Sequence, residues 1–437
     1  MEKKFRFSNT HTDFQARDAK VVFGWRYSPR IIFKAAKGTK LIDMDNNEYY
    51  DLTSGMMCMV LGHSHPEVTE VIREMAGTFL HQSSWYSNPW AVEFAERLGE
   101  TTTGDLKVVN FAVTGSEANE IAMRMALATT GKYDIVSMIR GLHGGSLAVE
   151  ALTSVGGNRR KNLGPLMFPA KANALLPPYC YRCPLGLEYP SCGVKCAQDL
   201  DELIQTETTG RPAAFIAEPI QGAGGFITPP KEYFEIAVGI VRKYGGLFIC
   251  DEVQSGFGRT GTHFWGFETQ GVVPDIVSMA KGIGNGCPLA AVVTTPKIAQ
   301  ALATRIHFNT FGGNPVVCAQ GRAVLEVIER EKLQQNSLEI GARLKAGFMK
   351  LAEKHALIGE VRGLGLMLGV ELVKDRKTKE PAKEEAARVW ESCKDMGLLL
   401  GKGGLWGNTL RIKPPMCLTR ADADFLLEVL DAALASA

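Results

Sequence analysis

The sequence predicts an α/β protein built on a mainly parallel sheet, and three observations support this fold class. Short apolar runs recur between about residues 60 and 310 and alternate with segments of helical periodicity. Runs that are apolar on both faces are typical of strands buried in a parallel sheet. Charged or small polar residues follow several of these runs, at the strand ends where open parallel sheets bind ligands.

The elements of the sheet region follow one another in a regular order. Residues 1–50 predict an irregular arm and a hairpin, whose turn is Asn46-Asn47 in TKLIDMDNNEYYDL. Two helices that begin near a proline are predicted for HPEVTEVIREMAG and NPWAVEFAERLGETT. The predicted strands are then KVVNFAV, DIVSMI, AAFIAEPI, LFICDEV, DIVSMA and LAAVVTT, with helices in SEANEIAMRMALATTG and PKEYFEIAVGIVRKYGG.

A smaller α+β unit is predicted after about residue 315. A long helical stretch leads into the strand VRGLGLMLGVELV, the helix AKEEAARVWESCKDMG, the strand TLRIKPP and the helix ADADFLLEVLDAALA. The run RGLGLMLG (362–369) mimics part of a dinucleotide-binding motif, but no helix follows it, so we interpret it as a packed strand. We expect an N-terminal arm with part of the small domain (1–60), a large domain (61–315) and a C-terminal small domain (316–437).

Composition excludes several classes of partner. The 437 residues are too many for one compact core, and the net charge of +2 gives no basic field for nucleic acid or an anionic membrane. The segment MEKKFRFSNTHTDF lacks the apolar core of a secretory signal. No apolar run reaches the roughly 18–20 residues of a membrane span. We therefore expect a soluble cytoplasmic protein without nucleic-acid or membrane partners.

Two strand ends carry groups suited to catalysis. Asp251 follows GLFIC, and a carboxylate held in apolar surroundings needs a cationic partner such as a protonated pyridine nitrogen. Lys281 closes another strand beside glycines, where an amine can lose its water shell and form a Schiff base. Val253 shares a strand face with Asp251 and could pack under a ring, and Gln254 could hydrogen-bond a phenolate oxygen. A turn-forming aspartate and a solvated lysine are the alternatives for each residue taken alone.

An anion site is predicted in VTGSEANE, where a strand ends at Thr114 and Gly115 and Ser116 open a helix. Free backbone N–H groups, a hydroxyl and the helix dipole favour phosphate there. The alternative is a capping box of Ser116 with Asn119 or Glu120. A phosphate site, a ring-nitrogen acid and an imine-forming lysine at the strand ends of one sheet together favour pyridoxal phosphate as the cofactor.

Six motifs occur in the order and spacing of one family: TGSEANE, EPIQGAGG, DEVQSGFGRTG, MAKGIGNG, TFGGNP and LRIKPP. On these motifs the chain resembles the class III aminotransferases, pyridoxal-phosphate enzymes of fold type I, along nearly its whole length. The runs HFWGFETQGVVPDIVSMAKGIGNGCPLAAVVTTP, HFNTFGGNP and PPMCLT make it similar to the alanine–glyoxylate aminotransferase 2 type. The resemblance implies a large domain with a mainly parallel seven-stranded sheet and a smaller α+β domain built from both termini.

The resemblance implies a role for each matching residue. Lys281 matches the Schiff-base lysine that later moves the substrate proton, and Asp251 matches the partner of the pyridine nitrogen. Thr310 matches a threonine that reaches the phosphate in the other subunit, which implies a homodimer with shared active sites and leaves a tetramer open. The implied cofactor-binding residues are Gly115, Ser116, Leu142, His143, Asp251, Val253, Gln254, Lys281 and Thr310.

Substrate binding is also implied by the resemblance. Arg411 matches the arginine that binds the substrate α-carboxylate, and its planar guanidinium suits that task. Glu218 matches a glutamate that can pair with this arginine in relatives accepting ω-amino donors. A purely structural ion pair is the alternative for both residues. The aromatic segment FGWRYSP (23–29) either lines the substrate pocket or packs in the core.

Two positions depart from the patterns of related enzymes. Leu142 in RGLHGG stands where the family usually has an aromatic residue stacked on the ring, and leucine supplies no π stacking. Met56 in LTSGMMCMVLGH stands where the dialkylglycine decarboxylases have a glutamine, and those enzymes have a tryptophan at the position of Leu142. The loss of both groups argues against decarboxylation.

Four clustered cysteines form a separate motif. Cys180, Cys183, Cys192 and Cys196 in YCYRCPLGLEYPSCGVKCA have the spacing C-x2-C-x8-C-x3-C. Structural zinc, free thiols and a disulfide stay open as interpretations, and none implies catalysis. The other six cysteines lie mostly in apolar contexts that suit reduced thiols.

The expected activity is a ping-pong transfer of an amino group. The resemblance implies alanine, β-alanine or another ω-amino donor and a 2-oxo acid such as glyoxylate or pyruvate. An amino-acid racemase or epimerase, or a decarboxylase of the same fold, would use the same lysine and aspartate. A non-catalytic protein that binds the cofactor or zinc is the alternative from another class.

Overall fold

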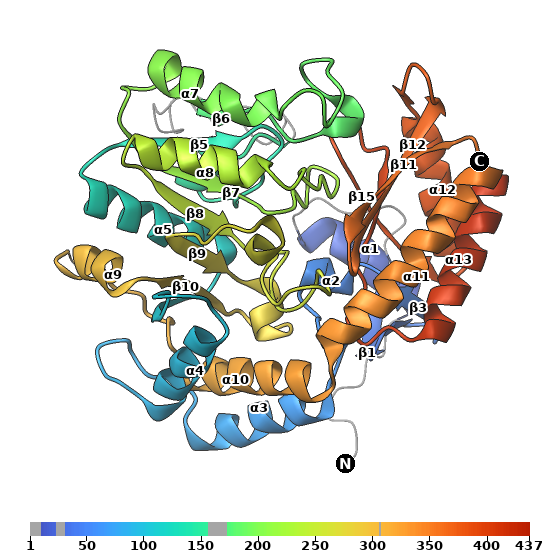
Figure 1. Cartoon of the computed structure of the whole chain (residues 1–437). Helices are drawn as coiled ribbons and strands as arrows, with labels where there is room; N and C mark the ends of the chain where they lie inside the picture. The colour runs from blue at the N-terminus through green and yellow to red at the C-terminus, as the bar shows by residue number, and fades with distance from the viewer. Residues whose placement is uncertain (1–9, 23–30, 156–172, 306) are drawn as a thin grey trace.

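A seven-stranded sheet forms the centre of the larger lobe in the computed structural model, which describes residues 10–22, 31–155, 173–305 and 307–437. Its strand order is β4-β10-β9-β8-β7-β5-β6 (Figure 1). The strands are β4 (Val108–Ala112), β5 (Asp134–Met138), β6 (Asn173–Leu175), β7 (Pro212–Ala217), β8 (Leu247–Asp251), β9 (Ile276–Met279) and β10 (Ala290–Thr294). Neighbouring strands are parallel except that β10 runs antiparallel to β4 and β9. The sheet is mainly parallel, as the sequence predicts, and β6 is a strand that the sequence pattern misses.

Alternation along the strands builds a core on each face of this sheet. In β7, Ala214 and Ile216 pack in the same apolar cluster as residues of α5 (Gly115–Thr130). The intervening Phe215 packs with residues of α7 (Lys195–Glu207) and α8 (Tyr233–Lys243) on the opposite face. In β8, Ile249 belongs to the α5 side. Asp251, two residues further, therefore points to the α5 side just where the strand ends.

The remaining helices of the larger lobe cover its edges. They are α2 (Ser54–Met57), α3 (Pro66–Thr78), α4 (Pro89–Glu100), α6 (Leu147–Leu152) and α9 (Pro296–Ala303), with 3-10 turns η3 (Cys180–Arg182), η4 (Gly266–Gln270) and η5 (Lys281–Gly284). Helices α3 and α4 begin with a proline at their first position, as predicted, because proline lacks an N–H that would have no partner there. Among the described residues, no helix is both long and apolar enough to cross a bilayer.

The chain after residue 315 differs from the sequence prediction at two points, and its first helix lies beside α3 and α4 of the larger lobe (Figure 1). The long helical stretch is two helices, α10 (Pro315–Arg330) and α11 (Leu333–Lys354), because Lys332 adopts a left-handed conformation with φ of 53°. The run VRGLGLMLGVELV is an antiparallel hairpin of β11 (Ile358–Leu364) and β12 (Met367–Asp375), and the interpretation as one strand is wrong. The chain reverses at Gly365, whose φ is 52°. The smaller lobe is completed by α12 (Lys383–Asp395), β13 (Glu380–Pro381), β15 (Gly401–Gly403), β16 (Thr409–Ile412) and α13 (Arg420–Ala435).

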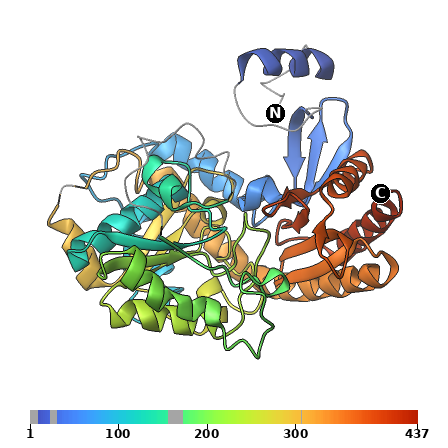
Figure 2. The ribbon, with the colours of Figure 1, turned by 90° about the horizontal axis from the view of Figure 1, so that it is seen from above.

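Strands from the two ends of the chain meet in a second sheet, of order β1-β2-β3-β14. The hairpin predicted near the N-terminus is β2 (Lys40–Asp43) and β3 (Glu48–Asp51), preceded by β1 (Phe33–Lys37) and α1 (His11–Val21). Strand β3 runs parallel to β14 (Leu398–Leu399), with Tyr50 opposite Leu398. Figure 2 shows these blue strands beside the red C-terminal helices. This pairing supports a small domain built from both termini.

Candidate active site

A cavity of about 360 Å³ lies where β8, β9 and the start of α5 meet. Nine of the residues predicted for the site line it: Gly115, Ser116, Leu142, His143, Glu218, Asp251, Val253, Gln254 and Lys281. Most of these residues follow a strand or open a helix at the carboxyl edge of the sheet, where open α/β sheets bind ligands. The fold thus brings together groups that lie far apart in the sequence.

Asp251 is fixed from several directions at the floor of the cavity. It is 3 % exposed, and its Oδ2 accepts hydrogen bonds from His143 Nδ1 and Asn119 Nδ2, both at 2.8 Å. Its Oδ1 accepts from the Val253 N–H at 3.1 Å. These donors compensate the carboxylate for its burial in an apolar site. The direction of the Asp251 carboxylate is therefore set before any ligand arrives.

Asn119 is a site residue that the sequence prediction missed. It lies on α5, is fully buried, and also donates to the His143 carbonyl at 2.7 Å while accepting from Ser278 Oγ at 2.5 Å. The sequence suggested Asn119 only as part of a helix cap. The N-cap is instead Thr114, whose side chain accepts from the Glu117 N–H. The four-residue spacing from Gly115 to Asn119 was the available signal, since it puts both on one helix face.

His143 is completely enclosed behind Asp251. Burial on its own would lower the pKa of His143, but the hydrogen bond to Asp251 and the charge of that carboxylate outweigh burial and raise it. The imidazole therefore favours its cationic form and strengthens the orientation of Asp251. The contact spans 108 residues of sequence.

Lys281 begins η5 directly after β9, with φ of 52°. This left-handed conformation is uncommon for a residue with a side chain, and such strain recurs at functional sites. Burial lowers the pKa of its amine, and the negative charge of Asp251 opposes this shift only in part. Lys281 therefore reaches its neutral, nucleophilic form more easily than a solvated lysine does.

The predicted anion site forms at the N-terminus of α5. Gly115 and Ser116 are its first residues, so their backbone N–H groups have no partner within the helix. The Ser116 hydroxyl accepts from the Gly145 N–H at 3.0 Å. A Cβ on Gly144 would lie 2.3 Å from that hydroxyl, and its φ of 146° also suits glycine. Backbone and hydroxyl groups of two loops thus form a cup that fits a phosphate.

Glu218 and Arg411 meet through one glycine. Glu218 is buried and accepts from the N–H groups of Leu142 and Gly222, each at 2.9 Å. Arg411 on β16 donates from Nη1 to the Gly222 carbonyl at 3.2 Å. A Cβ on Gly222 would lie 2.4 Å from the end of the Gln254 side chain, so the missing side chain of Gly222 leaves room for Gln254. Burial and the charge of Asp251 raise the pKa of Glu218 to about 7.

The other predicted positions differ in their surroundings. Leu142 and Val253 line the cavity, and the missing side chain of Gly115 leaves room for Val253 against the start of α5. Thr310 is exposed on this chain and does not line the cavity. The segment FGWRYSP (23–29) lies outside the described residues.

The cavity fits pyridoxal phosphate on its own geometry. The anion cup would hold the phosphate, the fixed Asp251 carboxylate would hold a pyridinium proton, and Lys281 would bind the aldehyde carbon. The small residues at Gly115 and Gly144 keep the cup open. Fold and site together define a pyridoxal-phosphate-dependent enzyme.

Comparisons with known proteins agree with this class. The family model for class III aminotransferases matches residues 24–434. Over 394 residues, 90% of this chain and 80% of the relative, the chain is 49% identical to alanine–glyoxylate aminotransferase 2 homolog 2, mitochondrial, of Arabidopsis thaliana. The chain belongs to the class III aminotransferase family, and it is a pyridoxal-phosphate-dependent aminotransferase.

Solved structures show the same architecture. A Bacillus anthracis aminotransferase is similar with a TM-score of 0.92 and 32% sequence identity, over 98% of both chains. An amine transaminase from an uncultivated Pseudomonas species, solved with its pyridoxal phosphate bound, has a TM-score of 0.87 and 30% identity, over 100% of this chain and 99% of that one. The predicted fold, family and cofactor are confirmed.

Proposed function

We propose that this aminotransferase moves the amino group of alanine, β-alanine or another ω-amino donor to a 2-oxo acid such as glyoxylate or pyruvate. The proposal depends on two hydrogen bonds near Lys281: the Gly222 N–H donates to Glu218, and Arg411 donates to the Gly222 carbonyl. It puts a carboxylate-binding guanidinium and a titratable carboxyl next to the reactive amine. The name of the Arabidopsis relative supports alanine and glyoxylate as substrates to test first.

The residues of the cavity divide the chemistry between them. When bound, pyridoxal phosphate withdraws electrons from the carbon that carries the substrate nitrogen. Asp251 would hold a proton on the ring nitrogen, and His143 and Asn119 keep that carboxylate in place. Lys281 would bind the aldehyde carbon and, when its amine is free, would take the proton from the substrate Cα and deliver it to the cofactor carbon. Leu142 would cover the ring without π stacking.

Arg411 and Glu218 give the pocket two ways to accept a donor. Arg411 binds a carboxylate with a planar pair of N–H donors. Because the pKa of Glu218 is raised to about 7, this carboxyl changes its proton content at little cost when the charge next to it changes. A donor without an α-carboxylate would leave Arg411 to be neutralised by ionised Glu218. The same pocket then serves α-amino and ω-amino donors.

A half-reaction tests the proposed function. The enzyme in its aldehyde form is mixed with an excess of one donor and no acceptor. We expect one equivalent of the pyridoxamine form per site, seen as bleaching of the aldehyde-form absorption, and one equivalent of 2-oxo acid. If the absorption persists while solvent deuterium enters the donor at Cα, the reaction is racemisation; release of CO2 would indicate decarboxylation. A panel of donors and acceptors ranks the substrates.

A homodimer with shared sites is part of the proposal. Thr310 lies in a loop with Phe308 (48 % exposed) and Phe311 (59 % exposed), and this loop packs against Trp85 (78 % exposed). Exposed aromatic side chains gathered around one loop are typical of protein interfaces. In a dimer this surface would be covered and Thr310 would reach the partner's phosphate cup. A tetramer remains open, and mass photometry distinguishes the states.

The cellular location is also a proposal. We infer a cytoplasmic location from the sequence composition, whereas the name of the Arabidopsis relative places that protein in mitochondria. Cell fractionation with an antibody to the chain decides between the two.

The four-cysteine segment keeps zinc as a testable prediction. All ten cysteines are free thiols in the structure. Burial, and next the charges of Cys180, Cys183 and Cys192, raise the pKa of Cys196 to about 12. Among the described residues, three or more possible metal ligands lie within 4.8 Å of one another only at His11, Asp43 and Asp45. The four cysteine sulfurs do not form such a group, so they are further apart than the ligands of one metal ion. A bound ion would therefore have to draw them together.

Elemental analysis checks the zinc prediction. About one zinc per chain would support the structural-zinc interpretation, and less than about a tenth of an equivalent would discard it. Thiol titration of the unfolded protein then separates free thiols from a disulfide. Cys393→Ser is a control, because Cys393 is buried in α12, outside the four-cysteine segment. This change should leave the zinc content unchanged.

A further inference from the structure

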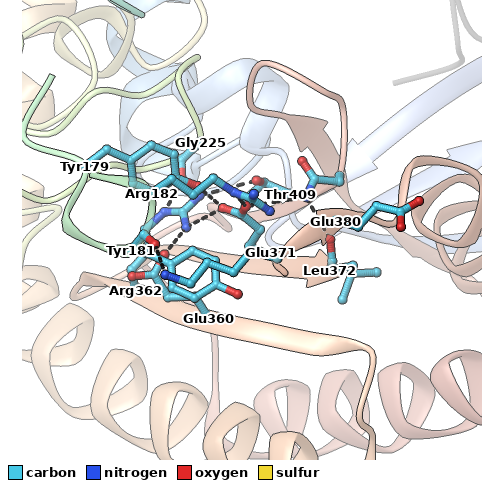
Figure 3. A network of polar contacts seen from close by, with 12 residues as sticks. Tyr179, Tyr181, Arg182, Gly225, Glu360, Arg362, Glu371, Leu372, Glu380 and Thr409 are labelled. Carbon is cyan, nitrogen blue, oxygen red and sulfur yellow. Dashed lines mark hydrogen bonds and ion pairs between the residues drawn. The ribbon is translucent and has the colours of Figure 1, made fainter. Parts of the chain in front are cut away.

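A buried polar cluster joins the two lobes beside β16, the strand that carries Arg411 (Figure 3). Its centre is Glu371 of β12, which is 0 % exposed. The Glu371 carboxylate accepts from Arg182 Nε at 2.6 Å, from Arg362 Nη1 at 2.7 Å and from the Tyr179 hydroxyl. We call Tyr179, Arg182, Arg362 and Glu371 the junction cluster.

Glu371 and Arg362 of the junction cluster favour their charged forms although they are buried. Burial on its own would raise the pKa of Glu371, but the charge of Arg362 and the hydrogen bonds from Tyr179 and Arg182 outweigh burial and lower it. Apolar side chains of similar size would usually stabilise such a position as well or better. A role in geometry explains the charges better than a role in stability.

The junction cluster draws its members from both lobes. Tyr179 and Arg182 lie in the segment between β6 and α7 of the larger lobe, next to Cys180 and Cys183. Arg362 and Glu371 lie on the β11–β12 hairpin of the smaller lobe. The Arg182–Glu371 pair therefore ties the cysteine segment to the sheet that contains β16.

Arg362 connects the junction cluster to β16, the strand of Arg411. Its Nη2 donates to Thr409 Oγ1 at 3.3 Å, and Thr409 precedes Arg411 by two residues on β16. Side chains two apart on a strand share a face. The neighbouring Asn408 is held as well, because its Nδ2 donates to the Leu372 carbonyl at 2.7 Å. The start of β16 is thus fixed from the junction cluster.

Arg362 also holds the turn on which Arg411 rests. Its Nε donates to the Gly225 carbonyl at 2.7 Å. The Gly225 N–H donates to the Gly222 carbonyl at 3.2 Å, and the same carbonyl accepts from Arg411 Nη1 at 3.2 Å. Arg362 therefore contacts both the strand that carries Arg411 and the turn of its Gly222 carbonyl partner, while the Lys402 carbonyl accepts from Arg411 Nη2 at 3.3 Å independently of Arg362.

Cation–π contacts connect the junction cluster to Arg140, in the segment that leads to Leu142 of the cavity. The Arg182 and Arg140 guanidiniums lie 4.8 and 5.0 Å from the ring of Trp406, in the loop just before β16. Arg140 also lies 4.7 Å from the ring of Tyr179. It precedes Leu142 of the cofactor cavity by two residues. Cation–π contacts of this kind fix planar groups face to face.

We propose that the junction cluster positions Arg411 for substrate carboxylates, with Arg182 as the positioning residue that the larger lobe supplies. Arg182 acts through Glu371 and Arg362 and does not touch the substrate. The inference rests on the proposed role of Arg411 as the carboxylate site. It assigns a task to the cysteine segment, which holds Arg182 at the lobe junction.

The test compares Arg182→Met with Arg182→Lys in the holoenzyme. Glu371 keeps Arg362 and Tyr179 in both variants, so both are expected to fold. For Arg182→Met we expect the KM for the 2-oxo acid and the inhibition constant of propionate, an unreactive carboxylate, to rise together by about 10-fold, with kcat changed less than about twofold. Arg182→Lys should recover part of the loss. Trp406→Leu should shift both constants in the same direction.

Two controls separate the outcomes. Arg343→Met removes a guanidinium that pairs with Asp424 on the surface at 2.7 Å, and it should change neither constant. Arg411→Leu should raise the inhibition constant by about 100-fold, the size expected for a lost bidentate charge contact. If Arg411→Leu has no effect, the proposed carboxylate site is wrong. If Arg411→Leu has its effect but Arg182→Met and Trp406→Leu leave the inhibition constant unchanged, or lower only kcat and thermal stability, the positioning role is wrong.

Discussion

Replacement of Lys281 by alanine is expected to slow transamination by about 10³-fold or more, because the variant loses both the amine that binds the cofactor and the base that moves the substrate proton. Positioned acid–base groups of this kind contribute about 10²–10⁴-fold to a rate. The backbone strain at Lys281 and its burial next to Asp251 hold the amine at one place in the cavity. No other lysine lines the cavity among the described residues.

The rate of a single turnover measures this effect without interference from product release. The variant is loaded with pyridoxal phosphate and mixed with donor, and its absorption is followed over time. Small primary amines such as methylamine should restore part of the rate, because the shortened side chain leaves room for them beside Asp251. Lys297→Ala, the same change at an exposed position of α9, should leave the rate unaltered. Full turnover by Lys281→Ala would overturn the assignment of Lys281.

Local patterns in the sequence located the parts of the site that depend on one strand end or one helix start. Asp251 ends an apolar run, Lys281 follows another, and Gly115 begins a helix, so each role could be predicted from its immediate neighbours. The antiparallel direction of β10 relative to β4 and β9 was not predictable in this way. A short apolar run has the same pattern in a parallel and an antiparallel strand.

Contacts across the fold were out of reach of the sequence pattern. Asn119 contacts Asp251 over 132 residues, and Arg182 contacts Glu371 over 189 residues. For Asn119 the only local signal is its four-residue spacing from Gly115 on one helix face, and the sequence around Arg182 does not distinguish it from a solvated arginine. The β11–β12 hairpin was missed for a related reason, since RGLGLMLG is apolar on both sides of its turn and resembles one long strand.

The residues that hold the site in place are mainly the long-range ones. Lys281 and Asp251 bring the reactive groups, but the direction of Asp251 comes from α5 and from the loop of His143. The Arg411 guanidinium likewise donates to the carbonyls of Gly222 and Lys402 in other elements. The reactive residues can therefore be predicted from strand ends in the sequence, whereas the contacts that orient them are seen only in the folded structure.

Replacement of Asp251 by asparagine is expected to lower the single-turnover rate by about 10²-fold or more while the anion cup still binds the cofactor phosphate. An asparagine carries no charge to hold a proton on the ring nitrogen. Its oxygen can accept from His143 and Asn119, as Oδ2 does now, but its amide then meets the Val253 N–H, a donor, where Oδ1 accepts today. The variant therefore loses both the charge and part of the orientation.

A cofactor with a methyl group on the ring nitrogen separates these two losses. Such a ring is positively charged without any help from Asp251, so it should restore much of the rate of Asp251→Asn and little of the rate of Lys281→Ala. If the methylated cofactor restores neither variant, orientation and not charge is what Asp251 supplies. Unchanged turnover by Asp251→Asn with the natural cofactor would remove Asp251 from the mechanism.

Thermal unfolding gives a readout of Asp251→Asn that does not depend on activity. Asp251 raises the pKa of His143 in the folded protein above its value in the unfolded chain. The pair therefore stabilises the fold fully below the unfolded-state pKa of histidine, and this contribution is lost as the pH rises through the raised pKa. The Tm of the native protein should exceed that of Asp251→Asn most at acidic pH, and the gap should narrow at alkaline pH. A gap that widened with pH would show that His143 and Asp251 do not form an ion pair in the native protein, and that a neutral His143 orients Asp251 only by its hydrogen bond.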